Sequence, residues 1–384
     1  MPGPIADVTV LDLSSGMAGS LCTMLLADNG ASVLKVDPPG GDPLAKGAAF
    51  RVWLRGKKSV TLDLETQEGK DILFRLLPTA DVLFETYQPG VAKRMGIDYE
   101  TLKQRAPHLV YCSLTPYGQD SADKDRPAYD GLVQAQMGLQ TTQPGHRPPP
   151  IYMGFAFPSF SGAYSASYGI LGALHARTVT GRGQFVDASL RGGSIVMNRW
   201  GWAAIPPEEG GAPRGEGGLT RAWQCSDGLL WTHTGARGSY ERMLGALGLA
   251  DKLPKEVLAA SRMDQTMTPA QRSQLLKDVE AVMASHKRQE IMGLMDDADV
   301  PNRPVLRAGE AFNDEQVKAI GGVVTVADPE LGDLREVAPP FDFEKTRPTT
   351  PATAPKLGIH TAEILGRAGY TAEDIQGLRF RGVI

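Results

Sequence analysis

The amino-acid sequence predicts an α/β protein built on a parallel, doubly wound sheet. Residues 8–13 (VTVLDL) form a short apolar run typical of a buried strand, residues 18–28 have helical spacing, and residues 32–37 form a second strand-like run. A strand–helix–strand unit of about thirty residues is typical of two neighbouring parallel strands. The alternation continues in strand-like and helical runs at 59–64, 66–77, 81–85, 99–105 and 109–114.

The second half of the chain predicts a smaller domain beside this sheet. A helix rich in small residues at 162–177 leads into a strand at 184–190, which extends the first domain. Residues 206–218 are dominated by Pro, Glu and Gly and predict a linker or loop. A hairpin at 222–234 and largely helical sequence at 240–295 follow, and we interpret them as the second domain. A chain of 384 residues also suits two domains, at about 150 residues each.

Composition excludes several classes of protein. The formal net charge is −4, which offers no broad positive surface for nucleic acid. No apolar run approaches the roughly 18 residues that span a bilayer, and no basic segment followed by an apolar stretch opens the chain. The cysteines Cys22, Cys112 and Cys225 lie far apart and suit a reducing cytoplasm, where we expect the protein. The spacing of Cys and His indicates no metal site.

Two features could belong to a phosphate-binding site. The loop at 15–19 follows the first strand and resembles a nucleotide-binding turn, but it does not match GxGxxG, and a tight turn before a helix is the alternative. A cluster of cations precedes the third strand, and Arg94 follows further along; such cations suit a polyphosphate ligand, with a solvated surface as the alternative. The clustered cations are Arg51, Arg55, Lys57 and Lys58.

A Ser/His/Asp hydrolase is not indicated by the sequence. Ser159 lies in the stretch Phe157-Pro158-Ser159-Phe160 rather than in a GxSxG elbow, and no base is nearby in the sequence. The carboxylates form no obvious acid–base pair. These local motifs therefore predict an α/β protein with a candidate phosphate site.

Longer blocks of the sequence resemble the family III CoA-transferases, in order over nearly the whole chain. Among them are Arg55-Gly56-Lys57-Lys58-Ser59, Glu85-Thr86-Tyr87-Gln88-Pro89-Gly90 and Thr180-Gly181-Arg182-Gly183-Gln184. Residues from about 193 to 302 match poorly. The blocks lie at 12–13, 18–19, 24–31, 36–43, 55–64, 85–90, 94–99, 117–120, 170–174, 180–184 and 354–358.

The resemblance implies a Rossmann-like large domain with a smaller inserted α+β domain, in an interlocked dimer whose chains thread through each other. The large CoA-binding domain would comprise residues 1–197 and 308–384, and the small domain residues 222–300, with linkers at 198–221 and 301–307. The family includes formyl-CoA, carnitine and benzylsuccinate CoA-transferases and 2-methylacyl-CoA racemases. Coenzyme A is therefore implied as acyl-CoA substrate and product, without a metal.

The resemblance also supplies a ligand for the candidate phosphate site, since CoA carries a 3′-phosphate and a pyrophosphate. It implies that the cations Arg55, Lys57 and Arg94 bind these groups. The path of the adenine and the pantetheine would be lined by Met17, Ala18, Pro38, Thr86 and Tyr87.

The position of the family's catalytic aspartate falls on Ser159, counted back without gaps from the run at 170–174. The transferase mechanism needs a carboxylate, which forms a mixed anhydride with the acyl group and then a thioester with CoA. A serine would form an ordinary ester instead. In the racemases the aspartate works with a histidine, whose position falls at or near Tyr129. Asp130 is the best remaining carboxylate, in a catalytic or a salt-bridge role.

Three functions stay open at this point. The first, which we expect, is a heteromeric CoA-transferase that acts on a CoA thioester and a carboxylic acid. This chain would be the subunit that lacks the aspartate, as in the benzylsuccinate type, beside a homologous chain that carries it. The second is a homodimeric acyl-CoA enzyme with racemase-like or lyase-like chemistry. The third is a CoA-binding protein without catalysis.

Overall fold

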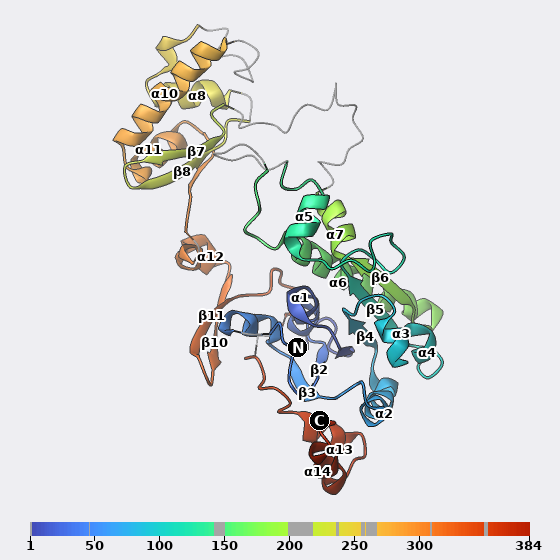
Figure 1. The fold of residues 1–384 in the computed structure, drawn as a ribbon. Coiled ribbons are helices and arrows are strands. Elements are labelled where there is room, and N and C mark those ends of the chain that lie inside the picture. The colour runs from blue at the N-terminus through green and yellow to red at the C-terminus, as the bar shows by residue number, and fades with distance from the viewer. Residues whose placement is uncertain are drawn as a thin grey trace. The chain divides into compact units, whose positions relative to one another are not determined.

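The computed structural model separates into two units, which Figure 1 colours by residue number. It describes residues 2–45, 47–141, 150–198, 218–235, 238–254, 258, 267–307, 309–348 and 352–384. Among these, the first unit takes the residues within Met1–Thr141, Tyr152–Ala203 and Lys318–Ile384, and the second those within Thr142–Ile151 and Ala204–Val317. The C-terminal segment therefore returns to the unit that contains the N-terminus.

A six-stranded sheet forms the centre of the first unit, and every neighbouring pair of its strands is parallel. The predicted α/β fold with a parallel sheet is confirmed. The chain winds outward from β1 to β3, returns to place β4 beside β1, and continues to the other edge, so the winding reverses between β1 and β4. The order is β3 (Lys58–Thr61), β2 (Ser32–Asp37), β1 (Thr9–Asp12), β4 (Val82–Glu85), β5 (Val110–Thr115) and β6 (Phe185–Ser189).

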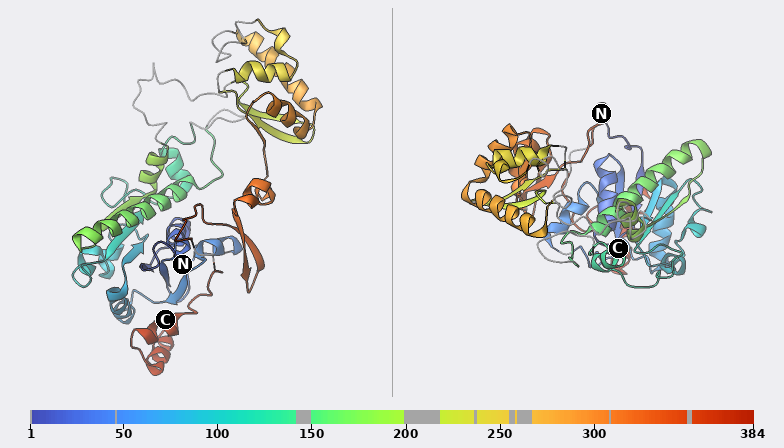
Figure 2. Two further views of the ribbon diagram at one scale, coloured as in Figure 1. Left: turned by 180° about the vertical axis from the view of Figure 1, so that it is seen from behind. Right: turned by 90° about the horizontal axis from the view of Figure 1, so that it is seen from above.

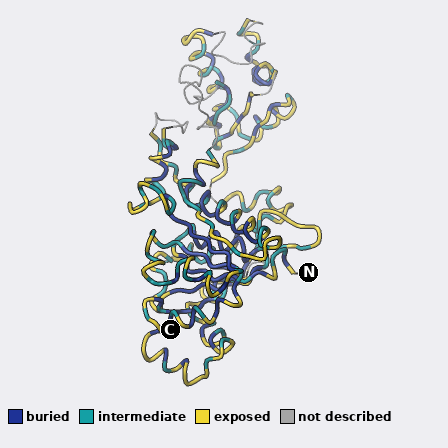
Figure 3. Tube along the Cα trace, turned by 90° about the vertical axis from the view of Figure 1, so that its right-hand side faces the viewer, coloured by how far each residue is buried: buried dark blue, intermediate teal, exposed yellow. Residues whose placement is uncertain are grey.

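Helices cover both faces of this sheet, which explains why its inner strands are apolar runs without polar alternation. Successive side chains of a strand point to opposite faces, so Val10 joins one core cluster and Leu11 the other. The cluster around Val10 includes residues of α1 (Gly16–Asp28) and α6 (Phe157–Thr180). Figure 3 shows the buried residues, in dark blue, concentrated in the interior of the traced chain.

C-terminal residues complete the other face. The cluster around Leu11 includes residues of α2 (Gln67–Leu76), but also of α13 (Thr361–Arg367) and α14 (Ala372–Phe380), which lie beside β3 (Figure 2). The Thr61 backbone N–H donates to Thr361 Oγ1 at 3.0 Å across 300 residues of sequence. The sheet is therefore covered by both ends of the chain.

Shorter elements connect these layers in the first unit. The antiparallel hairpin of β10 (Val323–Asp328) and β11 (Gly332–Val337) belongs to its C-terminal segment. The helix α12 (Glu315–Ala319) spans the boundary between the units. The others are η1 (Ala48–Leu54), η2 (Leu77–Thr79), α3 (Val91–Met95), α4 (Tyr99–Leu102), α5 (Asp130–Gln136) and α7 (Leu190–Met197).

The second unit has its own small sheet and core. The predicted hairpin is present as β7 (Arg221–Cys225) and β8 (Gly228–Thr232), and β9 (Asn302–Pro304) adds a third antiparallel strand. Trp223 is fully buried, and its Nε1–H donates to Thr232 Oγ1 at 2.8 Å. Residues of α8 (Ser239–Ala246), α10 (Pro269–Ser285) and α11 (Arg288–Asp297) join Trp223 in this core. The unit also contains η4 (Ala250–Lys252) and η6 (Glu310–Asn313).

The limits of the units differ from the expected domain limits in three places. Residues 150–151 group with the second unit, and the C-terminal return begins at Lys318 rather than at 308. The expected linker 301–307 instead contributes β9 to the small sheet. The sequence did not predict this strand, because three residues leave little pattern. The expected linker 198–221 lies largely outside the described residues.

Gly183, in the turn before β6, allows a close backbone approach that can be tested. A Cβ atom added there would lie 2.0 Å from the Leu109 carbonyl oxygen. We expect Gly183→Ala to lower the free energy of unfolding by about 2 kcal/mol, because backbone rather than a flexible side chain must shift. Urea denaturation measures the loss.

Gly172 provides the matched control for this substitution. It lies within α6, and a Cβ atom there would meet no atom within 4 Å. We expect Gly172→Ala to stabilise the protein by about 0.5 kcal/mol through helix propensity. Equal effects of the two substitutions would contradict the close approach at Gly183.

Candidate active site

The end of β1 and the end of β4 meet at the point where the winding of the sheet reverses. In doubly wound sheets, ligands bind in the crevice outside the carboxyl ends of the strands at this point. The Ser15 backbone N–H donates to Thr86 Oγ1 at 2.8 Å, which joins the loop after β1 to the residues after β4. At Gly19, a Cβ atom would lie 2.4 Å from that of Ser14 and 3.0 Å from Thr86 Cγ2, so only glycine fits.

Four residues expected along the CoA path lie on the two sides of this reversal point. Met17 and Ala18 form the first turn of α1 and are partly buried, and Thr86 and Tyr87 directly follow β4. The structure thus brings these sequence-distant candidates to one edge of the sheet. Tyr87 is partly buried against the core, and burial raises the pKa of its hydroxyl.

A third segment, after β2, reaches the start of α1. Pro38 is exposed and begins this segment. Further along it, Asp42 Oδ2 accepts the Gly16 backbone N–H at 2.8 Å, and its Oδ1 accepts that of Leu44 at 2.8 Å. Two of the first backbone donors at the start of α1 are therefore already used by Thr86 and Asp42, which fixes the helix end at the edge of the sheet.

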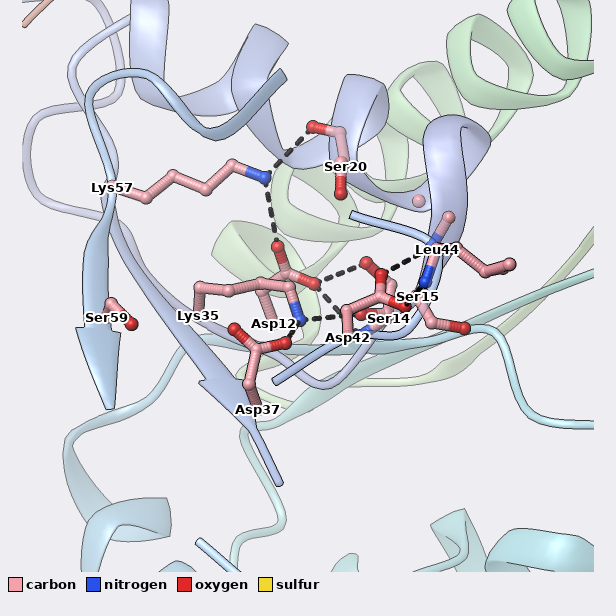
Figure 4. A network of polar contacts seen from close by, with 12 residues as sticks. Asp12, Ser14, Ser15, Ser20, Lys35, Asp37, Asp42, Leu44, Lys57 and Ser59 are labelled. Carbon is pink, nitrogen blue, oxygen red and sulfur yellow. Dashed lines mark hydrogen bonds and ion pairs between the residues drawn. The ribbon is translucent and has the colours of Figure 1, made fainter. Parts of the chain in front are cut away.

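A buried polar network lies directly beneath this edge (Figure 4). Asp12, at the end of β1, accepts hydrogen bonds from Ser14 and Thr23 and from Lys57 Nζ, the last at 3.2 Å. Lys57 also donates to the Ser20 carbonyl at 2.9 Å and to Thr23 Oγ1 at 2.6 Å. The network therefore ties β1, the first turns of α1 and the segment before β3 together.

Burial and charge oppose each other in this network. Both Asp12 and Lys57 have side chains with no exposed surface. Burial alone would raise the pKa of Asp12, but the ammonium groups of Lys57 and Lys35 hold it below its usual value. Burial lowers the pKa of Lys57, although Asp12 opposes this shift. Lys35 Nζ in turn lies 2.6 Å from Asp37 Oδ1, so two carboxylates face two ammonium groups.

Arg55 lies inside the unit as well. Its guanidinium pairs with Asp28 at 2.6 Å and with Glu336 at 3.0 Å, and it donates to the Val337 carbonyl at 2.8 Å. Burial lowers its pKa, but the two carboxylates raise it more. Arg55 thus connects α1 to the C-terminal hairpin.

The four clustered cations all have carboxylate partners, which the sequence analysis did not foresee. Arg51 pairs with Asp328 across 277 residues, and Lys58 pairs with Glu363 across 305. These contacts give Arg55 and Lys57 structural roles and do not favour them as phosphate ligands, so that assignment stays a prediction. Spacing along the sequence reveals a cluster of cations but not partners from the other end of the chain.

Beside the network lies a cavity of about 320 Å³. Its charges include the cations Lys35, Arg51 and Lys356 and the carboxylates Asp37 and Asp42. Charges of both signs suit a polar ligand that carries both anionic groups and hydroxyls. The other residues that line it are Gly41, Ala45, Leu54, Lys57, Ser59, Glu330, Pro355 and Leu357.

Arg94 lies apart from this cavity. It is exposed on α3, and in the described part of the chain no carboxylate pairs with its guanidinium. Its assignment as a ligand of a CoA phosphate stays a prediction.

Two of the three residues singled out for catalysis, Ser159 and Asp130, contact each other. Ser159, in the first turn of α6, is 6% exposed, and its backbone N–H donates to Asp130 Oδ1 at 3.0 Å. Its hydroxyl donates to Asp130 Oδ2. The carboxylate thus satisfies a first-turn donor of a helix 24 residues long, as a capping residue does. Tyr129, directly before Asp130, is 76% exposed.

The pattern that defines CoA-transferase family III matches residues 5–361. The chain belongs to this family. CoA thioesters are the substrates of family III enzymes, which agrees with the resemblance of the sequence blocks.

The similarity to individual relatives extends over nearly the whole chain. The succinyl-CoA–D-citramalate CoA-transferase of Chloroflexus aurantiacus is 28% identical over 100% of this chain and 98% of its own length. The succinyl-CoA:mesaconate CoA-transferase of Haloarcula hispanica is 29% identical over 96% and 97%. A CaiB/BaiF family protein from Brucella suis, with 27% identity, has a similar structure, with a TM-score of 0.84 over 96% of this chain and 100% of its own.

The described residues of this family III member give three further findings. Among them, no group of three or more His, Cys, Asp and Glu side chains is arranged to hold a metal ion. Within the same residues, no helix combines the length and apolar character needed to cross a membrane. Cys22, Cys112 and Cys225 are buried free thiols.

The ion pair of Lys57 and Asp12 can be tested by comparing Lys57 with its neighbour. We expect Lys57→Met to lower the free energy of unfolding by about 3–5 kcal/mol, because it leaves the Asp12 carboxylate buried without its nearest cation. Lys58→Met removes a cation whose pair with Glu363 is substantially exposed, and we expect little change. Urea denaturation of both variants measures the difference, and equal losses would contradict the role of the buried pair.

Proposed function

We propose that this chain takes part, in the cytoplasm, in CoA transfer from an acyl-CoA thioester to a carboxylic acid, as the subunit without the catalytic aspartate. It would form an interlocked dimer with a homologous chain that carries the aspartate. The observation that carries the proposal is the place of Ser159 at the start of α6, where the resemblance puts that aspartate. Its hydroxyl is held by Asp130.

The chemistry of the transfer explains why a serine does not replace the aspartate. A carboxylate attacks the thioester carbonyl and releases CoA thiolate, which leaves a mixed anhydride. The thiolate then attacks the enzyme's carbonyl carbon, so that the acid leaves and CoA stays on the enzyme as a thioester. A serine hydroxyl accepts the acyl group as an ester but has no carbonyl carbon to hold CoA. The second half of the transfer therefore needs a carboxylate from elsewhere.

A second candidate is that Asp130 supplies this carboxylate, in a homodimer that works alone. The contact with Ser159 favours it, because Asp130 lies within hydrogen-bond distance of the expected catalytic position. In such a homodimer, the same carboxylate could instead abstract a proton next to the thioester, which is the racemase-like or lyase-like alternative. A protein that binds CoA without turnover is the remaining alternative.

The relatives suggest the substrates to try first. Their names give succinyl-CoA as the donor with D-citramalate, mesaconate or glutarate, all dicarboxylic acids. We therefore propose a dicarboxylic acid as the acceptor. Transfer is followed by separating the CoA esters by liquid chromatography.

The two transferase candidates predict opposite results for the chain alone. If the aspartate comes from a partner, the wild-type chain alone has no transfer activity, and Ser159→Asp gains it, because the missing carboxylate is restored at the start of α6. Ser159→Asn introduces a side chain with the shape of aspartate but without a nucleophilic carboxylate, and this variant stays inactive. A tag on the chain then copurifies a homologous chain from the native source, which the mass of the intact complex reveals.

If Asp130 is the nucleophile, the wild-type chain alone is active, and Asp130→Asn lowers kcat by at least about a hundredfold. Asp125→Asn, at an exposed carboxylate five residues earlier, leaves the rate unchanged. Activity that survives Asp130→Asn would exclude this candidate. Binding of CoA without turnover by any variant or pairing would leave the non-catalytic alternative.

A further inference from the structure

Glu85, the last residue of β4, is a buried carboxyl group next to the reversal point of the sheet. It is 2% exposed, and its Oε2 accepts the backbone N–H of Tyr87. The residue between them, Thr86, accepts the hydrogen bond from the loop at the start of α1. Glu85 therefore holds the turn that carries two of the residues expected along the CoA path.

Side chains of β5 hold this carboxyl group from the other side. Ser113 lies opposite Glu85 in the register of the two strands, and the hydroxyls of Ser113 and Tyr111 favour the charged form of Glu85 and so lower its pKa. Gln119 Nε2 donates to Ser113 Oγ at 2.8 Å. The hydrogen bond from the Tyr87 N–H to the buried Glu85 side chain therefore links this polar group to the path of the chain after β4.

A cavity of about 270 Å³ lies behind the turn and is lined in part by Glu85, Gln88 and Gly90. The rings of Tyr99, Tyr111 and Phe185 pack against one another along it, with centroids 5.7–6.1 Å apart. The turn is thus not supported by packing alone, since open space lies behind it. The hydrogen bond from the Tyr87 N–H to Glu85 adds to the contact of Thr86 with Ser15 and the packing of Tyr87 against the core.

We propose that Glu85 is a positioning residue for the turn Thr86–Gly90, so that the shape and the charge of the CoA-thioester site depend on this one carboxyl group. The proposal rests on the proposed function in so far as CoA is the ligand of the turn. The hydrogen bond to Tyr87 does not depend on the ligand.

Burial, together with the groups around Glu85, makes its protonation state responsive near neutral pH. Burial raises the pKa of Glu85 to about 7, although Ser113 and the Tyr87 N–H lower it, and the nearby carboxylate of Asp187 raises it further. The neighbouring titratable groups are Tyr87 of the turn, Tyr111 of β5 and Asp187 of β6, with Lys93, Tyr99, Asp98 and Glu100 around the cavity. The neutral acid still accepts the Tyr87 N–H through its carbonyl oxygen.

The protonation state of Glu85 changes the affinity for CoA in a definite direction. Below pH 7 the group is neutral, and above pH 7 it places a negative charge beside the path of a polyanion. We expect the Kd of CoA for the wild-type protein to rise about threefold to tenfold more between pH 6 and pH 8 than that of Glu85→Gln. CoA's own phosphate also titrates near pH 6, and the comparison at each pH cancels this effect.

The experiment combines hydrogen exchange with calorimetry on the full chain. Amide exchange of residues 86–88 and 90 tests positioning without ligand: Glu85→Ala accelerates exchange at Tyr87 at least about tenfold, and Glu85→Gln, which keeps an acceptor oxygen, restores protection. Glu100→Gln, at an exposed carboxylate of the same cavity, changes neither readout. Titration with CoA at pH 6, 7 and 8 gives the Kd values.

The outcomes separate this inference from the proposed function. CoA binding with the same pH dependence in wild type and Glu85→Gln, or unchanged exchange at Tyr87 in Glu85→Ala, overturns the role of Glu85 and leaves the proposed function intact. Absence of CoA binding at every pH, with the expected exchange pattern, overturns CoA as the ligand and leaves the positioning of the turn. Equal exchange in Glu85→Ala and Glu85→Gln would also overturn positioning by an acceptor oxygen.

Discussion

The buried contact between Asp12 and Lys57 is the interaction on which the candidate site depends. Asp12 ends the central strand, and its carboxylate holds the loop through Ser14, the second turn of α1 through Thr23, and the segment before β3 through Lys57. Without the cation, a carboxylate with no exposed surface would have to take up a proton or water, and the loop would lose its anchor. The ion pair of Asp12 and Lys57, which lies beneath α1, thus fixes the position of the start of this helix.

The same principle extends to the C-terminal segment. Arg51 and Arg55 reach carboxylates of the hairpin formed by β10 and β11, and residues near the end of the chain cover β3. Buried pairs of this kind contribute little net stability compared with apolar packing, but breaking one is costly. These pairs specify that the C-terminal hairpin packs next to α1 and η1. The cavity beside Asp37 is therefore lined by residues from both ends of the sequence.

The sequence predicted much of the fold because its signals are local. Apolar runs such as the one at Val10 mark strands buried on both faces, and the order of strands and helices indicates a parallel sheet. It also singled out Ser159 and Asp130, which lie in contact. It did not identify the partners of Arg55 or the enclosure of Glu85, because both depend on contacts between distant segments. A three-residue strand such as β9 is too short to leave a periodic pattern.

The hydrogen bond between Thr61 and Thr361 has a consequence for synthesis on the ribosome. The two residues are 300 positions apart, so at 5–20 residues per second β3 waits roughly 15 to 60 s for its cover. During that time the apolar side chains that will contact Leu365 and Leu378 stay accessible, while the second unit emerges and can fold. The apolar face that α13 and α14 cover is therefore open to other apolar surfaces until these two helices leave the exit tunnel.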